Sequence, residues 1–213
     1  MKEKLFVSWS GGKDSYLSLL KAKEEGLDIQ YLLNFIGNQG RSMSHGISEE
    51  SLRQQADALG IPLITEQVSW GNYEEGFMRA ASKLKEKGIT GGIFGDINIA
   101  EHREWVEKMC NKLGLTAYLP LWDIAEEDVL AELIRREARL LIVSLDKKAL
   151  PQEWLGKEIN QNFLSVCMEA GVSPCGEKGE YHTMAIGGPL FRTSLEFVDK
   201  GCYELDNKYF LEI

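Results

Sequence analysis

Six consecutive residues near the start of the chain have the side chains of an anion-binding loop. They are Ser10, Gly11, Gly12, Lys13, Asp14 and Ser15. Glycines let the backbone approach oxygen atoms closely, serine hydroxyls donate hydrogen bonds, and the lysine adds a positive charge. The loop also leads from an apolar run into a helical pattern, and unpaired backbone N–H groups at a helix N-terminus favour negative charge. The loop is therefore predicted to hold phosphate groups.

Asp14 is the unusual member of this loop. A carboxylate repels phosphates unless a divalent cation lies between them, and Mg²⁺ is commonly bound by a carboxylate together with phosphate oxygens. We therefore predict that Asp14 is a metal ligand. The common P-loop is excluded, because it requires glycine where Val7 stands and serine or threonine where Asp14 stands. The alternative interpretation is a glycine-rich turn with a capping Asp14 and an exposed Lys13.

Other candidate residues lie where predicted strands end, at the edge where open parallel sheets bind ligands. Asp96, beside Gly95, could contact Mg²⁺, ribose or an acceptor, or it could only cap the next helix. His45 lies in a loop at the same edge, although a lone histidine there could be incidental. Arg103, in the first turn of a predicted helix, could contact a phosphate or could be an ordinary surface arginine.

Strand-like and helical runs alternate through the first part of the chain. The expected strands are 4–9, 29–36, 61–69, 90–97 and 115–121, and the expected helices are 15–26, 48–60, 73–88 and 100–114. This alternation predicts a parallel sheet, and strands that are apolar on both faces predict helices on both sides of it. Glycines near each expected helix end, and Ser48 before the second helix, are suitable caps. The prediction is an α/β, Rossmann-like fold.

The pattern changes after Pro120. The expected elements are helices 123–138 and 156–171 and strands 139–146, 180–188, 193–199, 201–206 and 208–213. Turn pairs such as Lys200-Gly201 and Asp206-Asn207 separate the last strands, which is typical of antiparallel hairpins. We predict a nucleotide-binding domain over residues 1–124 and a smaller α+β domain over residues 125–213, with a shared cleft.

Composition limits the classes of partner. The chain has 213 residues and a formal net charge of −9, which disfavours a large nucleic-acid surface. Four cysteines are widely spaced without a CxxC pair, so neither a zinc knuckle nor a disulfide framework is indicated. No apolar run reaches the roughly 20 residues of a membrane span, and no signal peptide is evident. We expect a cytoplasmic protein with reduced thiols; exposed edge strands near the C-terminus make a homodimer plausible.

Two motifs together resemble a known family. The loop at residues 10–15, after an apolar strand, resembles the pyrophosphate loop (PP-loop) of the N-type ATP pyrophosphatases, which have a HUP-type Rossmann-like fold and split ATP between the α and β phosphates. With Phe-Gly-Asp-Ile at 94–97, the stretch 173–191 is similar to the C-terminal signature of the diphthine–ammonia ligase family. The resemblance covers most of the chain. It implies amidation of diphthine on elongation factor 2 with ammonium and ATP, giving AMP and pyrophosphate.

The resemblance also implies roles for individual residues. Catalytic roles fall on Lys13, Asp14, Glu177 and Glu180. Contacts to ATP fall on Ser10, Gly11, Gly12, Lys13, Asp14, Ser15, His45, Gly95, Asp96 and Arg103. Contacts to the acceptor fall on Glu177, Glu180, His182 and Thr183, and Asp14 would bind Mg²⁺.

The two glutamates have more than one interpretation. Glu177 and Glu180 could orient the acceptor or take a proton from ammonium, in an order that the sequence leaves open. Alternatively, they belong to a solvated hairpin turn. A transition-metal site with His182 ranks low because no second histidine is near in the sequence. For Cys175 we expect a structural or pocket-lining role rather than that of a nucleophile.

Two other functions remain open at this point. The same activation of a carboxylate could serve another acceptor, such as tRNA or a small carboxylic acid. Alternatively, the chain could be a sensor that binds ATP without turnover; such a sensor would need the glycines and the lysine but not Glu177 and Glu180.

Overall fold

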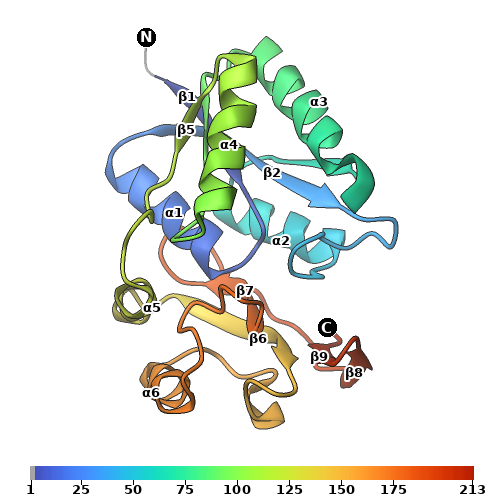
Figure 1. Cartoon of the computed structure of the whole chain (residues 1–213), viewed down its shortest axis with the longest axis vertical. Coiled ribbons are helices and arrows are strands. Elements are labelled where there is room, and N and C mark those ends of the chain that lie inside the picture. Colours follow the sequence, from blue (N-terminus) through green and yellow to red (C-terminus); the bar gives the residue numbers. More distant parts are fainter. Residues whose placement is uncertain (1–2) are drawn as a thin grey trace.

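The computed structural model describes residues 3–213 and contains a five-stranded, all-parallel sheet (Figure 1). Its strands are β1 (Lys4–Ser8), β2 (Asp28–Ile36), β3 (Leu63–Gln67), β4 (Gly91–Ile93) and β5 (Thr116–Tyr118). The strand order is β3-β2-β1-β4-β5, so the chain runs outward to one side through β2 and β3 and to the other through β4 and β5. The switch point lies between β1 and β4. Ligands of open α/β sheets bind outside the carboxyl ends of the strands at such a point.

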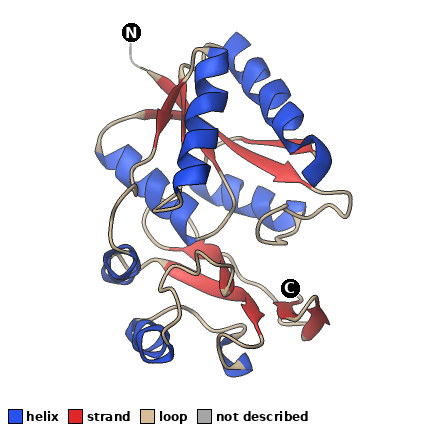
Figure 2. Ribbon diagram, in the orientation of Figure 1, coloured by secondary structure: helices blue, strands red, loops and turns tan. Residues whose placement is uncertain are grey.

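Helices cover both faces of this sheet, as the sequence predicts (Figure 2). They are α1 (Lys13–Glu24), α2 (Glu49–Leu59), the short η1 (Trp70–Asn72), α3 (Tyr73–Glu86) and α4 (Ala100–Leu113). Side chains of β1 alternate between the faces: Leu5 and Val7 join a core with α1 and α2, whereas Phe6 joins a core with α3 and α4. Burial on both faces explains why these strands are apolar throughout.

The predicted helix caps are confirmed. The Ser48 side chain accepts a hydrogen bond from Ser51 N at 3.1 Å at the start of α2. The C-caps of α2 and α4 are Gly60 and Gly114, with φ of 67° and 63°, where a side chain would be strained. The helices therefore end where the chain must turn back toward the next strand.

The second part of the chain forms a four-stranded antiparallel sheet with order β7-β6-β9-β8. Its elements are α5 (Glu126–Arg135), β6 (Arg139–Asp146), the short η2 (Gln152–Trp154), α6 (Gln161–Ala170), β7 (Tyr181–Gly187), β8 (Cys202–Leu205) and β9 (Lys208–Leu211). Asp206 and Asn207 both have positive φ in the β8–β9 turn, as a tight hairpin requires. The predicted combination of a parallel α/β fold and a smaller α+β part is confirmed.

One predicted strand is wrong. Residues 193–199 form an irregular segment outside both sheets. Its backbone is held by bonds to both parts of the molecule: Arg192 N, directly before the segment, donates to Ala58 O, and Leu195 N, within it, donates to Ile186 O. Its β-branched and aromatic residues favour a strand, but its backbone makes these tertiary hydrogen bonds instead of pairing with a neighbouring strand.

The two sheets are joined by a continuous core. Buried residues of α1, β6, α6 and β7 belong to one cluster, and the Tyr16 ring meets the Phe191 ring edge-on with centroids 5.4 Å apart. The division at residues 124 and 125 stays a prediction, as does the homodimer.

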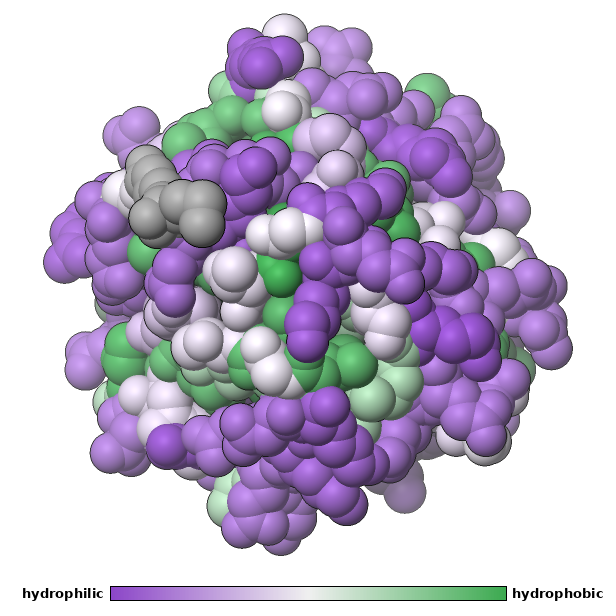
Figure 3. Space-filling view, turned by 90° about the horizontal axis from the view of Figure 1, so that it is seen from above, coloured by the Kyte–Doolittle hydropathy of each residue, from purple (hydrophilic) through white to green (hydrophobic). Residues whose placement is uncertain are grey.

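The upper end of the molecule, remote from β7, shows mainly hydrophilic side chains with small apolar groups between them (Figure 3). Among the helices of residues 3–213, none is long and apolar enough to cross a membrane.

Candidate functional site

The loop between β1 and α1 lies at the switch point of the sheet, against the loop that follows β4. A Cβ added at Gly95 would lie 3.0 Å from both the carbonyl carbon of Asp14 and the nitrogen of Ser15. These are backbone atoms that cannot move aside easily. Glycine at position 95 therefore lets the two loops pack closely, and it brings Asp96 to the same edge as the phosphate loop, residues 10–15.

Hydroxyl groups fix the shape of the phosphate loop. Ser10 Oγ accepts from Gly12 N at 3.3 Å and lies 3.1 Å from Ser15 Oγ, which donates to Gly12 O at 3.0 Å. The predicted residues Ser10, Gly12 and Ser15 are thus brought together. The same hydroxyls can turn toward phosphate oxygens, because a hydroxyl both donates and accepts.

Strand β7 holds the phosphate loop from the other part of the molecule. Ala185 N donates to Gly11 O at 2.8 Å, and Lys13 N donates to the Thr183 hydroxyl at 3.0 Å across 170 residues of sequence. These two hydrogen bonds attach the loop to β7, which is an edge strand of the antiparallel sheet. Thr183, predicted to contact the acceptor, lies against the loop itself.

Gln55 was not singled out from the sequence, although its side chain connects the phosphate loop to β7 and to Trp9. Its side chain is fully buried; Nε2 donates to Gly11 O at 2.9 Å and to Ala185 O at 2.7 Å, while Oε1 accepts from Trp9 Nε1 at 3.0 Å. The signal in the sequence is a polar residue on the apolar face of an amphipathic helix, next to Leu52 and Ala56. Such a residue needs buried partners.

Lys13 and Asp14 form a largely buried ion pair. Lys13 Nζ lies 2.7 Å from Asp14 Oδ2, and the side chains are 5% and 19% exposed. Burial alone would lower the pKa of Lys13, but the charge of Asp14 and its hydrogen bond with Lys13 raise that pKa above its ordinary value. Lys13 is therefore a fixed cation at any physiological pH.

Asp14 has one oxygen without a partner. Oδ1 is buried and makes no hydrogen bond within residues 3–213. Burial raises the pKa of Asp14, and Lys13 opposes this shift. A buried, unpaired carboxylate oxygen costs free energy unless a ligand supplies a partner, so it fits a bound cation. In the described residues no three metal-binding side chains converge.

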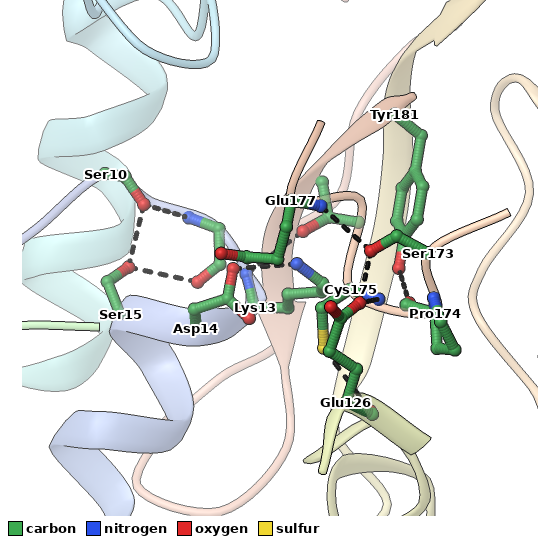
Figure 4. Close-up of polar contacts among 12 residues, drawn as sticks. Ser10, Lys13, Asp14, Ser15, Glu126, Ser173, Pro174, Cys175, Glu177 and Tyr181 are labelled. Carbon is green, nitrogen blue, oxygen red and sulfur yellow. Dashed lines mark hydrogen bonds and ion pairs between the residues drawn. The ribbon is translucent and has the colours of Figure 1, made fainter. Parts of the chain in front are cut away.

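Glu177 faces the ion pair from the loop before β7 (Figure 4). Burial, and then the negative charge of Asp14, raise its pKa to about 7, with Glu126 and Asp96 adding to the shift and Lys13 opposing it. A carboxyl group that titrates near neutral pH can exchange protons efficiently under physiological conditions. Glu177 is thus a candidate acid–base group directly beside the phosphate loop.

Glu180 does not share this position. Its carboxylate accepts from Lys178 N at 3.0 Å, and its backbone carbonyl accepts from Asp146 N at 2.8 Å. These contacts, as far as residues 3–213 show, place it in the turn before β7 rather than beside Lys13. The two glutamates, which the sequence left equivalent, therefore have different surroundings.

His45 and His182 lie together over the phosphate loop. Their ring centroids are 4.7 Å apart, and a Cβ added at Gly12 would lie 2.6 Å from His45 Nε2. Burial, the neighbouring His182 and Lys13 lower the pKa of His45 well below its ordinary value. Burial, Lys208 and Lys13 lower the pKa of His182 to about 4. Both rings are neutral at pH 7 and can donate hydrogen bonds to an anion.

Asp96 and Arg103 have other partners. Asp96 Oδ1 lies 3.3 Å from His102 Nδ1. Arg103 Nε lies 2.7 Å from Glu107 Oε1, and its guanidinium carbon lies 4.9 Å from the centroid of the Trp122 ring. Asp96 thus remains at the edge of the site, whereas Arg103 is held on the surface of α4.

A second residue that the sequence analysis missed is Glu126, at the first position of α5. Its carboxylate accepts from Asn98 Nδ2 at 2.9 Å, from Cys175 N at 3.2 Å and from the Ser173 hydroxyl. The only sign in the sequence is an acidic residue in the first turn of a helix, which usually has no more than a dipole role. Cys175 itself is buried, and burial raises the pKa of its thiol, so a nucleophilic role is disfavoured.

Two hollows flank the site. One, of about 560 Å³, extends from His45 and His182 to Trp70 and Lys208. The other, of about 720 Å³, includes Glu177. The two hollows share no lining residue, and each has room for a separate ligand.

Comparison with known proteins assigns this arrangement to a family. Residues 3–117 match the family described as "Diphthamide synthase N-terminal domain", and residues 125–213 match "Diphthamide synthase C-terminal domain". The chain belongs to the diphthamide synthase family. The predicted resemblance is thereby confirmed at the level of the family.

Individual relatives of this diphthamide synthase family member are distant. The chain is 27% identical over 212 residues to the diphthine–ammonia ligase of Mus musculus and 29% identical over 212 residues to that of Homo sapiens, in each case covering 87% of this chain and 79% of the relative. The diphthine–ammonia ligase of Schizosaccharomyces pombe is 24% identical over 221 residues, or 92% of this chain and 36% of its own length. The likeness extends over both sheets.

Proposed function

We propose that this chain is an ATP-dependent diphthine–ammonia ligase that amidates diphthine on elongation factor 2, with ammonium as the nitrogen source and AMP and pyrophosphate as products. Family membership supports a ligase. The observation that carries the proposal is the placement of Glu177, with its pKa of about 7, directly across from the Lys13–Asp14 pair of the phosphate loop. A sensor that only binds ATP has no need of such a group.

The phosphate loop accounts for the leaving group. The acceptor carboxylate oxygen attacks the α-phosphorus of ATP, and the bond from that phosphorus to pyrophosphate breaks. Lys13 and the N-terminus of α1 stabilise the negative charge that develops on pyrophosphate, and both are in place before the reaction. Asp14 would hold Mg²⁺, which when bound neutralises phosphate charge. The neutral rings of His45 and His182 donate to phosphate oxygens.

Glu177 is assigned the uptake of a proton from the nitrogen that forms the amide. Ammonia attacks the carbonyl carbon of the acyl adenylate, the carbon–oxygen bond breaks, and AMP leaves with that oxygen. Ammonium must lose a proton before the attack and the new amide loses one after it. An ionised Glu177 carboxylate takes up such a proton readily because its pKa lies close to the working pH.

The two hollows accommodate the remaining parts of the substrates. We assign adenosine to the side of Trp70, where apolar and aromatic side chains suit a flat base. A buried oxygen there, Asn34 Oδ1, has no hydrogen-bond partner in the described residues and could accept from an amino group. The acceptor then enters beside Glu177. A cytoplasmic location and a homodimer remain expectations of this proposal.

Substitution of Lys13 tests the first step, in which pyrophosphate is released. Lys13→Ala should lower pyrophosphate release by about 100–1,000-fold, because it removes a fixed cation from the leaving group. The exposed Lys148 lines neither hollow, so Lys148→Ala is the matched control and should keep the wild-type rate. AMP and pyrophosphate are measured with ammonium and elongation factor that carries diphthine. Equal rates for both variants would contradict the role of the loop.

Substitutions of the two glutamates separate amide formation from the binding of ATP. Glu177→Gln should bind ATP normally and lose amide formation, whereas Glu180→Gln should lose less because its carboxylate bonds within its own turn. ATP binding is measured by calorimetry and amide formation by mass spectrometry of the factor. If Glu180→Gln were the more severe variant, the assignment of the base would be wrong.

A further inference from the structure

Glu126 connects the two loops that bring acidic groups to the phosphate loop. Its Oε1 accepts from Asn98, two residues beyond Asp96 in the loop that follows β4. Its Oε2 accepts from the Ser173 hydroxyl and from Cys175 N, both in the loop that carries Glu177. One carboxylate thus satisfies donors from two segments that the sequence separates by more than 70 residues.

The connection continues to Glu177 itself (Figure 4). Ser173 Oγ donates to Glu126 and accepts from Glu177 N at 3.0 Å. The backbone position of Glu177 is therefore set by a chain of two hydrogen bonds that begins at Glu126. Cys175 Sγ adds a contact at 3.4 Å to the Glu126 carbonyl. In the described structure the Glu177 carboxylate makes no hydrogen bond of its own, so its place depends on this backbone anchor.

We infer that Glu126 is a positioning residue that holds Glu177 over the Lys13–Asp14 pair and keeps the loop after β4 in register with it. This inference rests on the proposed function, in which Glu177 moves a proton. The hydrogen bonds from Ser173, Asn98 and Cys175 outweigh burial and keep the pKa of Glu126 below its ordinary value, so Glu126 is a permanent acceptor. Its charge also helps to keep the pKa of Glu177 high.

Glu126→Gln tests this role with little change of shape. A glutamine side chain has one acceptor oxygen instead of two, so its NH₂ group must oppose at least one of the three donors. The control is Asp128→Asn, which makes the same change of charge at an exposed site in the same helical turn. Ser173→Ala is a second test, because it breaks the connection to Glu177 and leaves the other bonds of Glu126 intact.

The first measurement is steady-state kinetics. We expect Glu126→Gln and Ser173→Ala to lower kcat for amide formation by about 10–100-fold through misplacement of Glu177, with the KM for ATP unchanged within about twofold. Since both act through one connection, the double variant should lose little more than the worse single variant. A wild-type kcat in Glu126→Gln, or an equal loss in Asp128→Asn, would overturn the inference.

The second measurement does not need the reaction. The carboxyl carbon of Glu177, assigned by comparison with Glu177→Gln, is titrated by carbon-13 NMR. Its midpoint should lie near 7 in the wild type and in Asp128→Asn, and should fall toward the ordinary value in Glu126→Gln and Ser173→Ala. An unchanged midpoint in both test variants would overturn the inference even if kcat fell. If only the proposed function is wrong, the midpoints still shift while no amide forms.

Discussion

The surroundings of Glu177 oppose its ionised form. Its pKa rises from 4.5 to about 7 because of burial and the charge of Asp14. The folded protein therefore binds this proton more tightly than the unfolded chain does. By linkage, the group contributes no penalty well below pH 4.5, an increasing penalty between about pH 4.5 and 7, and a constant penalty above that range.

A stability measurement follows at this scale. Glu177→Gln removes the penalty, so it should stabilise the fold at pH 8 by about 1 kcal/mol after allowance for partial exposure, which corresponds to roughly 2–4 °C in Tm. The gain should disappear at pH 4. The exposed Glu169→Gln is the control for the loss of one carboxyl group. A Glu177→Gln variant that is less stable at pH 8 than at pH 4, relative to wild type, would contradict the raised pKa.

Single residues also show the limit of sequence analysis. Residues 10–15 could be singled out from the sequence because glycines, hydroxyls and a lysine directly after a strand all suit the binding of an anion. Gln55 and Glu126 could not, because each is an ordinary residue in an amphipathic helix until its partners are known. Those partners, such as Ala185 for Gln55 and Cys175 for Glu126, lie 130 and 49 residues away.

At the scale of elements, the phosphate loop is held between α2 and β7. Gln55 bonds to carbonyl groups of both the loop and β7 and to the Trp9 indole. Lys13 N bonds to Thr183 on the same strand. The shape of the loop is thus determined by elements on both sides, which preorganises the groups that we propose to hold phosphate.

Gln55→Leu tests this support. The substitution leaves the buried Trp9 N–H without its acceptor and removes one donor each from Gly11 O and Ala185 O, so the free energy of unfolding should fall by about 1–3 kcal/mol. ATP should also bind more weakly because Gly11 O loses one of its two hydrogen bonds and keeps only the one from Ala185 N. The neighbouring Gln54 is exposed, and Gln54→Leu is the matched control. Chemical denaturation and calorimetry measure the two effects; wild-type stability in Gln55→Leu would rule out the support.

The elements themselves were largely predictable, for physical reasons. Apolar strands, amphipathic helices and capping glycines all agree in the first part, so local preference and tertiary structure coincide there. Residues 193–199 were misjudged because strand propensity is weak evidence without a partner strand. The backbone is bonded instead at Arg192, directly before this segment, to Ala58 O and at Leu195, within it, to Ile186 O.

At the scale of the whole molecule, the site is made by the junction of the two sheets. Residues 10–15 come from the first part, whereas Glu177, His182 and Thr183 come from the second, and α1 packs against β7 in one continuous core. The Tyr16 hydroxyl also donates to the Pro189 carbonyl. Because the junction is packed and hydrogen-bonded, the groups that we propose to act on ATP and on the acceptor are held in one fixed relation.

The central claim is that the acceptor carboxylate attacks the α-phosphorus of ATP held by this loop. The most direct test uses elongation factor whose diphthine carboxylate carries oxygen-18, with ammonium and ATP, and analyses the products by mass spectrometry. We predict AMP with one labelled oxygen and unlabelled pyrophosphate, in step with amide formation. ADP together with labelled orthophosphate would contradict the account.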